Sequence, residues 1–185
     1  SCSKDTTTIS AQSSIVGSTS LIPSNNNGYL IQHTYFTLSY SETNRQAEWV
    51  AYNLTLSFIN GPQARTDDFR IDPKVKNNPV GSGDYSGSGY DRGHLCPAGY
   101  MKLNLTSMSE TFYMSNMSPQ DPSFNRGIWE TLESRVRTWA NEKNGVYVVT
   151  GPILKNICGS IKNGTISVPC SYYKIVFKDN GTEKI

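Results

Sequence analysis

The sequence predicts an α+β fold, in which strands and one long helix follow each other without regular alternation. Residues 48–58 alternate apolar and polar side chains, which is the period of a half-buried β-strand. Residues 125–143 repeat apolar side chains at every fourth position, as an amphipathic helix does. Two apolar segments, residues 146–150 and 172–177, have the composition of buried strands. Elements in this order favour an α+β architecture over a βαβ chain.

The first 28 residues differ in composition from the rest of the 185-residue chain. They are rich in Ser, Thr, Asn and Gly and carry few large apolar side chains. Such a segment cannot bury enough apolar surface to order itself as a core. We therefore predict a flexible polar tail or tether over residues 1–28 and a single domain over residues 29–185.

The strand at residues 48–58 has its apolar side chains at every second position: Val50, Tyr52, Leu54, Leu56 and Phe58. Asn60-Gly61-Pro62 ends it. Residues 64–80 form no periodic pattern. Residues 81–89 hold four glycines but lack the Lys-Ser/Thr of a nucleotide loop, so we interpret them as a flexible approach to a site.

The charge balance indicates no particular partner. Seventeen Lys and Arg against fifteen Asp and Glu give a net charge of +2, which neither demands nor excludes a polyanion. No run of about eighteen apolar residues occurs, so the sequence predicts no membrane span. The residues indicate no particular oligomeric state.

The four cysteines lack the close repeated spacing of a zinc knuckle. Cys158 and Cys170 bracket a turn-like Lys162-Asn-Gly164, which favours a local disulfide and hence an oxidising compartment. Four reduced thiols in a cytosolic protein are the alternative. Cys2, followed by a Ser/Thr-rich segment, resembles the lipid-acceptor cysteine of bacterial lipoproteins. A disulfide between Cys158 and Cys170 would indicate a secreted, periplasmic or outer-surface location.

The helix predicted at residues 125–143 carries two rows of side chains. The buried stripe is expected to consist of Ile128, Leu132, Val136 and Ala140. A second row at the same spacing lies along a slanting face and consists of Asn125, Trp129, Glu133 and Arg137. Taken alone, Glu133 and Arg137 would be an ordinary i,i+4 ion pair.

Asp91-Arg92-Gly93-His94 gathers a carboxylate, a guanidinium and an imidazole in four residues. Because the chain has only two histidines, multi-histidine zinc sites of the usual kinds are excluded, and His94 remains as a single base or acid. A neutral imidazole suits proton abstraction near pH 7.

Three blocks in order, residues 91–94, 113–120 and 124–133, resemble the DNA/RNA non-specific endonuclease family. These are the ββα-metal nucleases, which include the Serratia nuclease and endonuclease G. The resemblance covers roughly residues 48–177. It implies a ββα-metal fold with a central, mostly antiparallel sheet flanked by helices, and the hydrolysis of DNA and RNA without strong sequence preference.

The resemblance also implies roles for single residues. His94 would be the general base, and Asn125 the one direct protein ligand of Mg²⁺, with Mn²⁺ as a substitute ion. Glu133 would hold waters of the metal. Asp91 would orient the loop beside the substrate. The products would carry 5′-phosphates.

The same resemblance places the arginines on the substrate phosphate. Arg92 and Arg137 would neutralise the scissile phosphate, together with either Arg65 or Arg70, between which the sequence does not decide. Asn116 would belong to the substrate-binding site. Cys96 departs from the family pattern, where a small residue such as alanine is common, and this suggests a modified or tethered loop.

Two further expectations concern the whole chain. A non-catalytic module that binds polyanions through the same arginines is the alternative function. Lys178-Asp-Asn-Gly181 is a strong hairpin signal, yet only residues 182–185 follow it. We therefore expect the chain to be cut short at its C-terminus.

Overall fold

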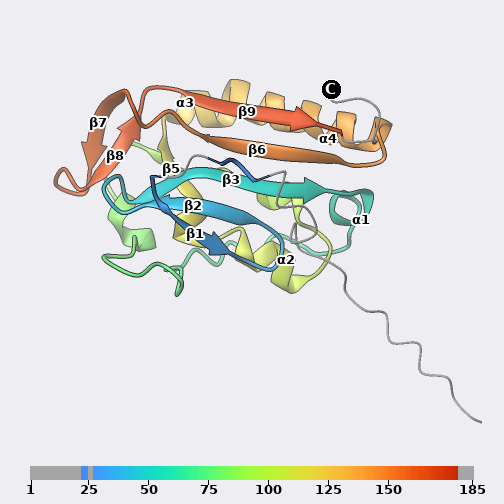
Figure 1. The fold of residues 1–185 in the computed structure, drawn as a ribbon, viewed down its shortest axis with the longest axis horizontal. Helices are drawn as coiled ribbons and strands as arrows, with labels where there is room; N and C mark the ends of the chain where they lie inside the picture. The colour runs from blue at the N-terminus through green and yellow to red at the C-terminus, as the bar shows by residue number, and fades with distance from the viewer. Residues whose placement is uncertain (1–21, 25–26, 179–185) are drawn as a thin grey trace, which may run out of the picture.

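The computed structural model describes residues 22–24 and 27–178. It confirms the α+β fold, which is built on one five-stranded antiparallel sheet (Figure 1). In spatial order the strands of this sheet are β1 (Tyr29–Gln32), β2 (Thr37–Ser41), β3 (Gln46–Leu54), β6 (Val146–Pro152) and β9 (Tyr172–Phe177). The order shows that β6 and β9, from the second half of the chain, extend a meander made by the first half.

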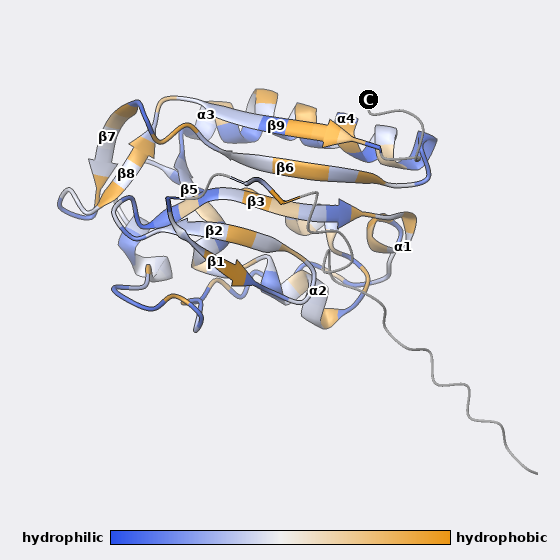
Figure 2. Ribbon diagram, in the orientation of Figure 1, coloured by the Kyte–Doolittle hydropathy of each residue, from blue (hydrophilic) through white to orange (hydrophobic). Residues whose placement is uncertain are grey.

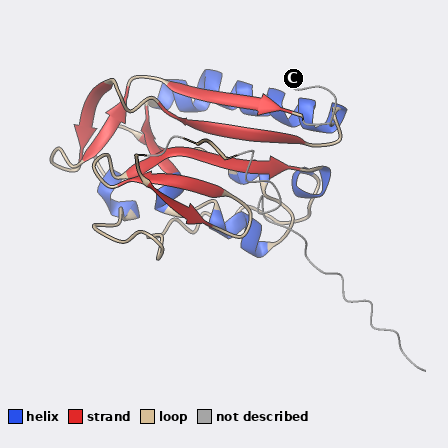
Figure 3. Ribbon diagram, in the orientation of Figure 1, coloured by secondary structure: helices blue, strands red, loops and turns tan. Residues whose placement is uncertain are grey.

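Two small two-stranded sheets complete the β structure. One pairs β4 (Asp91–His94) with β5 (Met117–Gln120), and the other pairs β7 (Ile157–Ile161) with β8 (Ile166–Pro169). The helices are α1 (Leu56–Ile59), α2 (Leu105–Glu110), α3 (Pro122–Phe124) and α4 (Glu130–Glu142). Short 3₁₀ helices occur at Ser82–Tyr85, Ala98–Tyr100 and Met114–Asn116. The chain between α1 and β4 is mostly loop (Figure 3).

The main core lies between the large sheet and α4, which runs behind β6 and β9 in Figure 1. Val136 and Ala140 of α4 are fully buried there, together with Val146 and Val148 of β6. In Figure 2 the ribbon is coloured as hydrophobic along the first half of β6 and the end of β9. Ile59 of α1 and residues of the segment 95–101 also belong to this core, so they and α4 pack together against the sheet.

The strand predicted at residues 48–58 differs from β3 in two respects. Trp49 and Ala51, on the opposite face from Val50, are also buried, because Ile22, Tyr173 and Phe177 pack against them. The prediction of a half-buried strand is therefore wrong. Ile22 makes this contact from within the predicted tail.

The same strand also ends earlier than predicted, at Leu54, and the chain turns into α1. The cause is tertiary. The Lys102 amide donates to Phe58 O at 2.9 Å, and the Gln63 amide donates to Lys102 O at 3.0 Å. These bonds hold the segment away from the sheet, and no local sequence pattern encodes them.

The predicted helix at residues 125–143 begins with a π-helical turn, Asn125–Trp129, which leads directly into α4. Gly127 has non-helical torsion angles within it (φ −109°, ψ −108°). The extra residue per turn rotates the side chains that precede α4 relative to those in it. As a result Ile128 is 67% exposed and Trp129 takes the buried place, so the prediction of a buried Ile128 is wrong.

The β7–β8 hairpin confirms the predicted disulfide, since Cys158 and Cys170 are bonded. Its turn contains Lys162, Asn163 and Gly164, all with positive φ. Three expectations fall outside the described residues: the lipid-acceptor Cys2, most of the tail, and the hairpin signal beyond Lys178. Within the part of the chain that the structure describes, no helix is long and apolar enough to cross a membrane.

Removal of this disulfide should destabilise the hairpin measurably. The bond closes a loop with a sequence separation of 12, and a loop of this size contributes about 3 kcal/mol through restriction of the unfolded chain. We expect the C158S/C170S double variant to melt at a lower temperature than the parent protein. Dithiothreitol should shift the melting temperature of the parent protein but not that of the variant. Recovery of Cys158 and Cys170 as free thiols in non-reducing peptide maps would contradict the assignment.

Candidate active site

The β4–β5 pair brings the two predicted blocks of functional residues together. Asp91 lies opposite Gln120 and His94 lies opposite Met117 in the antiparallel register. Because side chains alternate along a strand, Arg92 and His94 project to the same side. A Cβ on Gly93 would lie 2.2 Å from Gln120 Oε1, so the Gln120 side chain occupies the space that a larger residue at position 93 would need.

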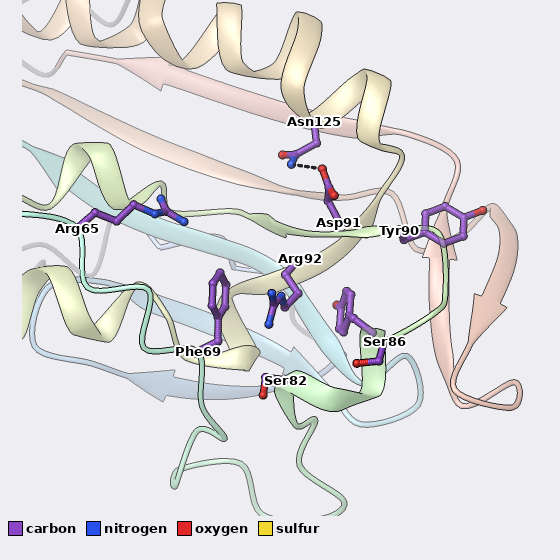
Figure 4. A pocket seen from close by; sticks show the side chains of 9 residues that line it. Arg65, Phe69, Ser82, Ser86, Tyr90, Asp91, Arg92 and Asn125 are labelled. Carbon is purple, nitrogen blue, oxygen red and sulfur yellow. Dashed lines mark hydrogen bonds between the residues drawn. The ribbon is translucent and has the colours of Figure 1, made fainter.

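Arg92 and His94 project into a cavity of about 240 Å³. An adjoining cavity of about 380 Å³ shares Arg65, Arg92 and Asn125 with it. Figure 4 shows the second cavity, with Asn125 reaching in from the helical segment and Arg65 and Phe69 from the loop after α1. Among the predicted site residues, the first cavity is lined by Arg65, Arg92, His94, Asn125, Glu133 and Arg137.

The His94 imidazole is held among aromatic rings. Its ring centroid lies 5.1 Å from that of Phe112 in an edge-on contact, and 5.8 Å from that of Phe69. Its Nε2 atom is buried and has no hydrogen-bond partner among the described residues. Burial, reinforced by the nearby charges of Arg65 and Arg92, lowers the pKa of His94 to about 3. The imidazole is therefore neutral at physiological pH.

Asn125 is oriented by Asp91. Its Nδ2 donates to Asp91 Oδ2 at 2.9 Å, and Arg126 donates to both oxygens of the same carboxylate at 2.8 and 2.6 Å. The bond from Arg126 is the main reason why the pKa of Asp91 is lowered. Figure 4 shows the amide oxygen of Asn125 on the side away from Asp91. Asp91 is therefore placed to orient Asn125 rather than to bind substrate itself.

Glu133 and Arg137 line the cavity from successive turns of α4. Burial raises the pKa of the Glu133 carboxyl group, and the charges of Lys174 and Arg137 oppose that shift. Arg137 Nη2 donates to Ser134 Oγ at 2.7 Å. No ion pair joins Glu133 to Arg137 among the described residues, so the interpretation of the pair as an ordinary surface salt bridge is wrong.

The structure separates the two candidate arginines of the irregular segment. Arg65 lines both cavities, and its guanidinium carbon lies 4.8 Å from the centre of the Phe112 ring. Arg70 is turned elsewhere: it stacks on Tyr113 at 4.1 Å, pairs with Asp68 at 2.6 Å and donates to Ser109 O at 2.8 Å. Only Arg65 shares the cavities with His94 and Asn125.

Asn116 does not face the cavities. It is 0% exposed, and its amide accepts from the Cys96 amide at 2.9 Å and donates to Cys96 O and Thr111 O at 2.9 and 2.8 Å. The prediction of Asn116 as a substrate ligand is therefore corrected: it fixes the backbone two residues after His94. Cys96 is buried without a disulfide partner, and burial raises the pKa of its thiol.

Sequence reasoning missed three residues around this site. Phe69 and Phe112 form the aromatic wall beside His94, and no spacing in the sequence signals that role. Lys174 lies under Trp129, with its Nζ atom 4.6 Å from the ring centre. Here a signal existed, because Lys174 interrupts the otherwise apolar residues 172–177.

The oxygen ligands in the cavity suit a hard divalent cation. Residues 22–24 and 27–178 contain no cluster of three or more His, Cys, Asp or Glu side chains that could hold a metal. The cavity instead offers the Asn125 amide oxygen and the Glu133 carboxylate. A small set of this kind fits Mg²⁺, which dehydrates reluctantly and keeps several of its waters.

Two short antiparallel strands followed by the helical segment that carries Asn125 correspond to the ββα-metal fold. A model of the DNA/RNA non-specific endonuclease family matches residues 18–184. The chain therefore belongs to the DNA/RNA non-specific endonuclease family. A chain in the crystal structure of the EndoG/EndoGI complex has the same fold, with a TM-score of 0.75 and 34% sequence identity over 82% of this chain and 68% of that chain.

Three relatives show how much of a nuclease the chain represents. Nuclease C1 of Cunninghamella echinulata var. echinulata is 34% identical over 83% of this chain and 67% of its own length. A nuclease of Nostoc sp. is 37% identical over 85% and 56% of the two chains. Mitochondrial endonuclease G of Homo sapiens is 38% identical over 64% and 40%. The chain thus spans between 40% and 67% of these relatives.

The low pKa of His94 can be measured directly. We expect its imidazole NMR signals to stay in the neutral form from pH 8 down to about pH 5, because charging it would place a cation in a dry, positively charged site. An unfolded histidine takes up a proton near pH 6.5, whereas the folded His94 does not. The contribution of His94 to the free energy of unfolding is therefore fully present above about pH 6.5. It is lost as the pH falls toward the folded pKa.

The H94N variant serves to assign the signals, because His33 is the only other histidine. A His94 titration midpoint near that of a free imidazole would contradict the buried, neutral state.

Proposed function

We propose that this protein is a metal-dependent endonuclease that hydrolyses phosphodiester bonds in DNA and RNA without strong sequence preference. The observation that carries the proposal is a single cavity lined by a neutral histidine, an oriented asparagine amide, two carboxylates and four arginines. Hydrolysis of a phosphodiester needs a base for water and positive charge around the phosphate in the transition state. Each of these requirements has a candidate side chain in the cavity.

We assign His94 as the general base. A neutral imidazole can accept a proton from water, whereas an imidazolium cannot. A base with a pKa near 3 is weak in the free protein. A phosphate bound between Arg65 and Arg92 would offset the positive charges that contribute to this low pKa. Substrate binding therefore raises the basicity of His94 at the moment when a base is required.

We assign Arg65, Arg92 and Arg137 to the scissile phosphate. Guanidinium groups present paired donors that match phosphate oxygens. Arg92 also packs against the Phe69 ring, with its guanidinium carbon 4.1 Å from the ring centre, which limits its conformations. Contacts to phosphate carry no base information, and this supports cleavage of many sequences.

We assign Asn125 as the direct ligand of Mg²⁺ and Glu133 as a partner that contacts the ion through water. When bound, the ion supplies positive charge to the phosphate and its leaving oxygen. The chain contributes the orientation of the amide, through Asp91, and the placement of the carboxylate, through α4. The family resemblance supports Mn²⁺ as a substitute and 5′-phosphates on the products.

A non-catalytic module that binds polyanions is the alternative. Such a module would need the arginines but neither a desolvated imidazole nor a buried carboxylate, both of which are costly to maintain. The cavity contains both, which supports catalysis. For the location of the protein, the Cys158–Cys170 disulfide supports an oxidising compartment outside the cytosol.

Two single substitutions test the assignment of base and metal ligand. We expect H94A to lower plasmid cleavage by about 10²–10⁴-fold, the usual effect of losing a general base, while the affinity for Mn²⁺ is unchanged. N125A should instead raise the Mn²⁺ and Mg²⁺ concentrations needed for half-maximal cleavage. Plasmid and single-stranded RNA are each incubated with Mg²⁺ and with EDTA.

Wild-type protein that binds both nucleic acids but cleaves neither in Mg²⁺ would establish the binding module instead. Wild-type rates for H94A would remove His94 from the mechanism.

The two arginines of the irregular segment provide a matched pair. R65A removes a guanidinium that lines both cavities, so we expect kcat/KM to fall by about 10-fold or more, as for loss of a charge-assisted contact worth at least about 1.4 kcal/mol. R70A removes a charge of the same kind five residues away but outside the cavities. Its kcat/KM should stay close to the wild-type value, with any loss appearing in the melting temperature. Equal losses of kcat/KM in both variants would show that distance from the cavity does not matter.

A further inference from the structure

Lys174 is a partly buried residue whose charged end is turned into the protein. It lies in β9 opposite Thr150 of β6. Its Nζ atom is buried and has no hydrogen-bond partner among the residues that the structure describes. Buried ammonium groups in native proteins are nearly always paired, because removing the charge from water is expensive. Packing alone therefore does not explain why a lysine occupies position 174.

The surroundings of Lys174 connect it to the catalytic cavity. Its Nζ atom lies 4.6 Å from the centre of the Trp129 ring and 6.0 Å from that of Tyr100. Trp129 ends the π-helical turn that Asn125 begins. Tyr100 Oη donates to the carbonyl oxygen of Glu133 at 2.8 Å. The ammonium thus contacts, through two aromatic rings, the backbone that carries both Asn125 and Glu133.

The charge of Lys174 also acts on Glu133. Burial raises the pKa of Glu133 and lowers the pKa of Lys174, and in each case the charge of the other residue opposes the shift. A buried carboxylate and a buried ammonium stabilise each other when both are charged, since the interior screens their attraction poorly. Glu133 and Arg137 both line the cavity, whereas Lys174 does not, so Lys174 acts on Glu133 from outside the cavity lining.

We propose that Lys174 is a positioning residue for the divalent cation: through the Trp129 ring and the Glu133 charge, it holds the Asn125 amide and the Glu133 carboxylate in place from behind. The proposal rests on the metal-dependent function argued above. It explains why a buried ammonium without a hydrogen bond persists at this position. Removing such a group from water is costly, so packing alone does not account for a lysine here.

The test uses K174M, which keeps an unbranched side chain and removes the charge. K178M is the matched control, because Lys178 follows the same strand and its Nζ donates to Asn144 O near the surface. Mn²⁺ is titrated into metal-free protein and free Mn²⁺ is followed by electron paramagnetic resonance, which requires no turnover. Thermal melts of the same samples report folding.

For K174M we expect Mn²⁺ affinity to fall by about 10–100-fold, the usual effect of losing a residue that supports a metal ligand. K174M should remain folded at the temperature of the titration, although the loss of one of two opposite buried charges lowers its melting temperature. K178M should match the wild type in affinity. Wild-type Mn²⁺ affinity in K174M overturns the proposal, and so does a loss of affinity that merely follows a loss of folding.

The double variant E133Q/K174M separates a positioning role from a structural one. If Lys174 acts on the ion through Glu133, K174M should weaken Mn²⁺ binding much less in the E133Q background than in the wild-type background. Equal effects in both backgrounds overturn the proposal. If K174M alone fails to fold, we expect the double variant, which lacks both charges, to fold. A double variant that also fails to fold overturns the proposal.

These outcomes are distinct from a failure of the proposed function. Wild-type protein that neither binds Mn²⁺ nor cleaves nucleic acid with Mg²⁺ would remove the metal site itself. Wild-type protein that does both, beside a K174M variant that binds Mn²⁺ equally well, would remove only the role of Lys174.

Discussion

The Asp91 carboxylate joins the two parts of the site. It belongs to β4, yet it accepts hydrogen bonds from Asn125 and Arg126 in the helical segment 34 and 35 residues later in the chain. Without this link, the strand that carries Arg92 and His94 and the helix that carries Glu133 and Arg137 would be placed only by packing. The Asp91 carboxylate therefore fixes β4 and the helical segment relative to each other, and the cavity lies between them. The bidentate bond from Arg126 adds directional restraint, because a planar guanidinium fixes the orientation of the carboxylate it binds.

The electrostatics of the cavity follow from that assembly. Arg65, Arg92 and Arg137 gather positive charge beside a histidine whose Nε2 atom is buried. Burial, and after it the charges of Arg65 and Arg92 that would attract a phosphate, lower the pKa of His94 and keep the imidazole neutral. Burial also disfavours the charged form of Glu133, and this raises the pKa of its carboxyl group. The charges of Lys174 and Arg137 oppose that shift.

Much of this arrangement could be predicted from local sequence, and the exceptions have physical causes. His94, Asn125 and Glu133 were placed in one site because their blocks resemble a family, and the structure gathers them. Ile128 was wrongly assigned to the core because a π-helical turn changes the period of the helix, and a constant period of 3.6 residues cannot represent this. Arg65 and Arg70 could not be separated from sequence, since their directions depend on contacts with Phe112 and Tyr113 far along the chain. Asn116 was expected at the substrate, but its amide satisfies buried backbone groups of the His94 loop.

The site is built from groups that a purely stable protein would avoid. His94 Nε2 and Lys174 Nζ are buried without hydrogen-bond partners within the described part of the chain, and Glu133 is held against the cost of its burial. Each such group costs free energy of folding, and a marginally stable domain can carry few of them. They are tolerated here because the surrounding framework is strongly determined: β3 is packed on both faces, and Val136 and Ala140 fix α4 to the sheet. The packed sheet and α4 thus hold these groups in place despite their cost, which is how a stable scaffold can maintain a reactive cavity.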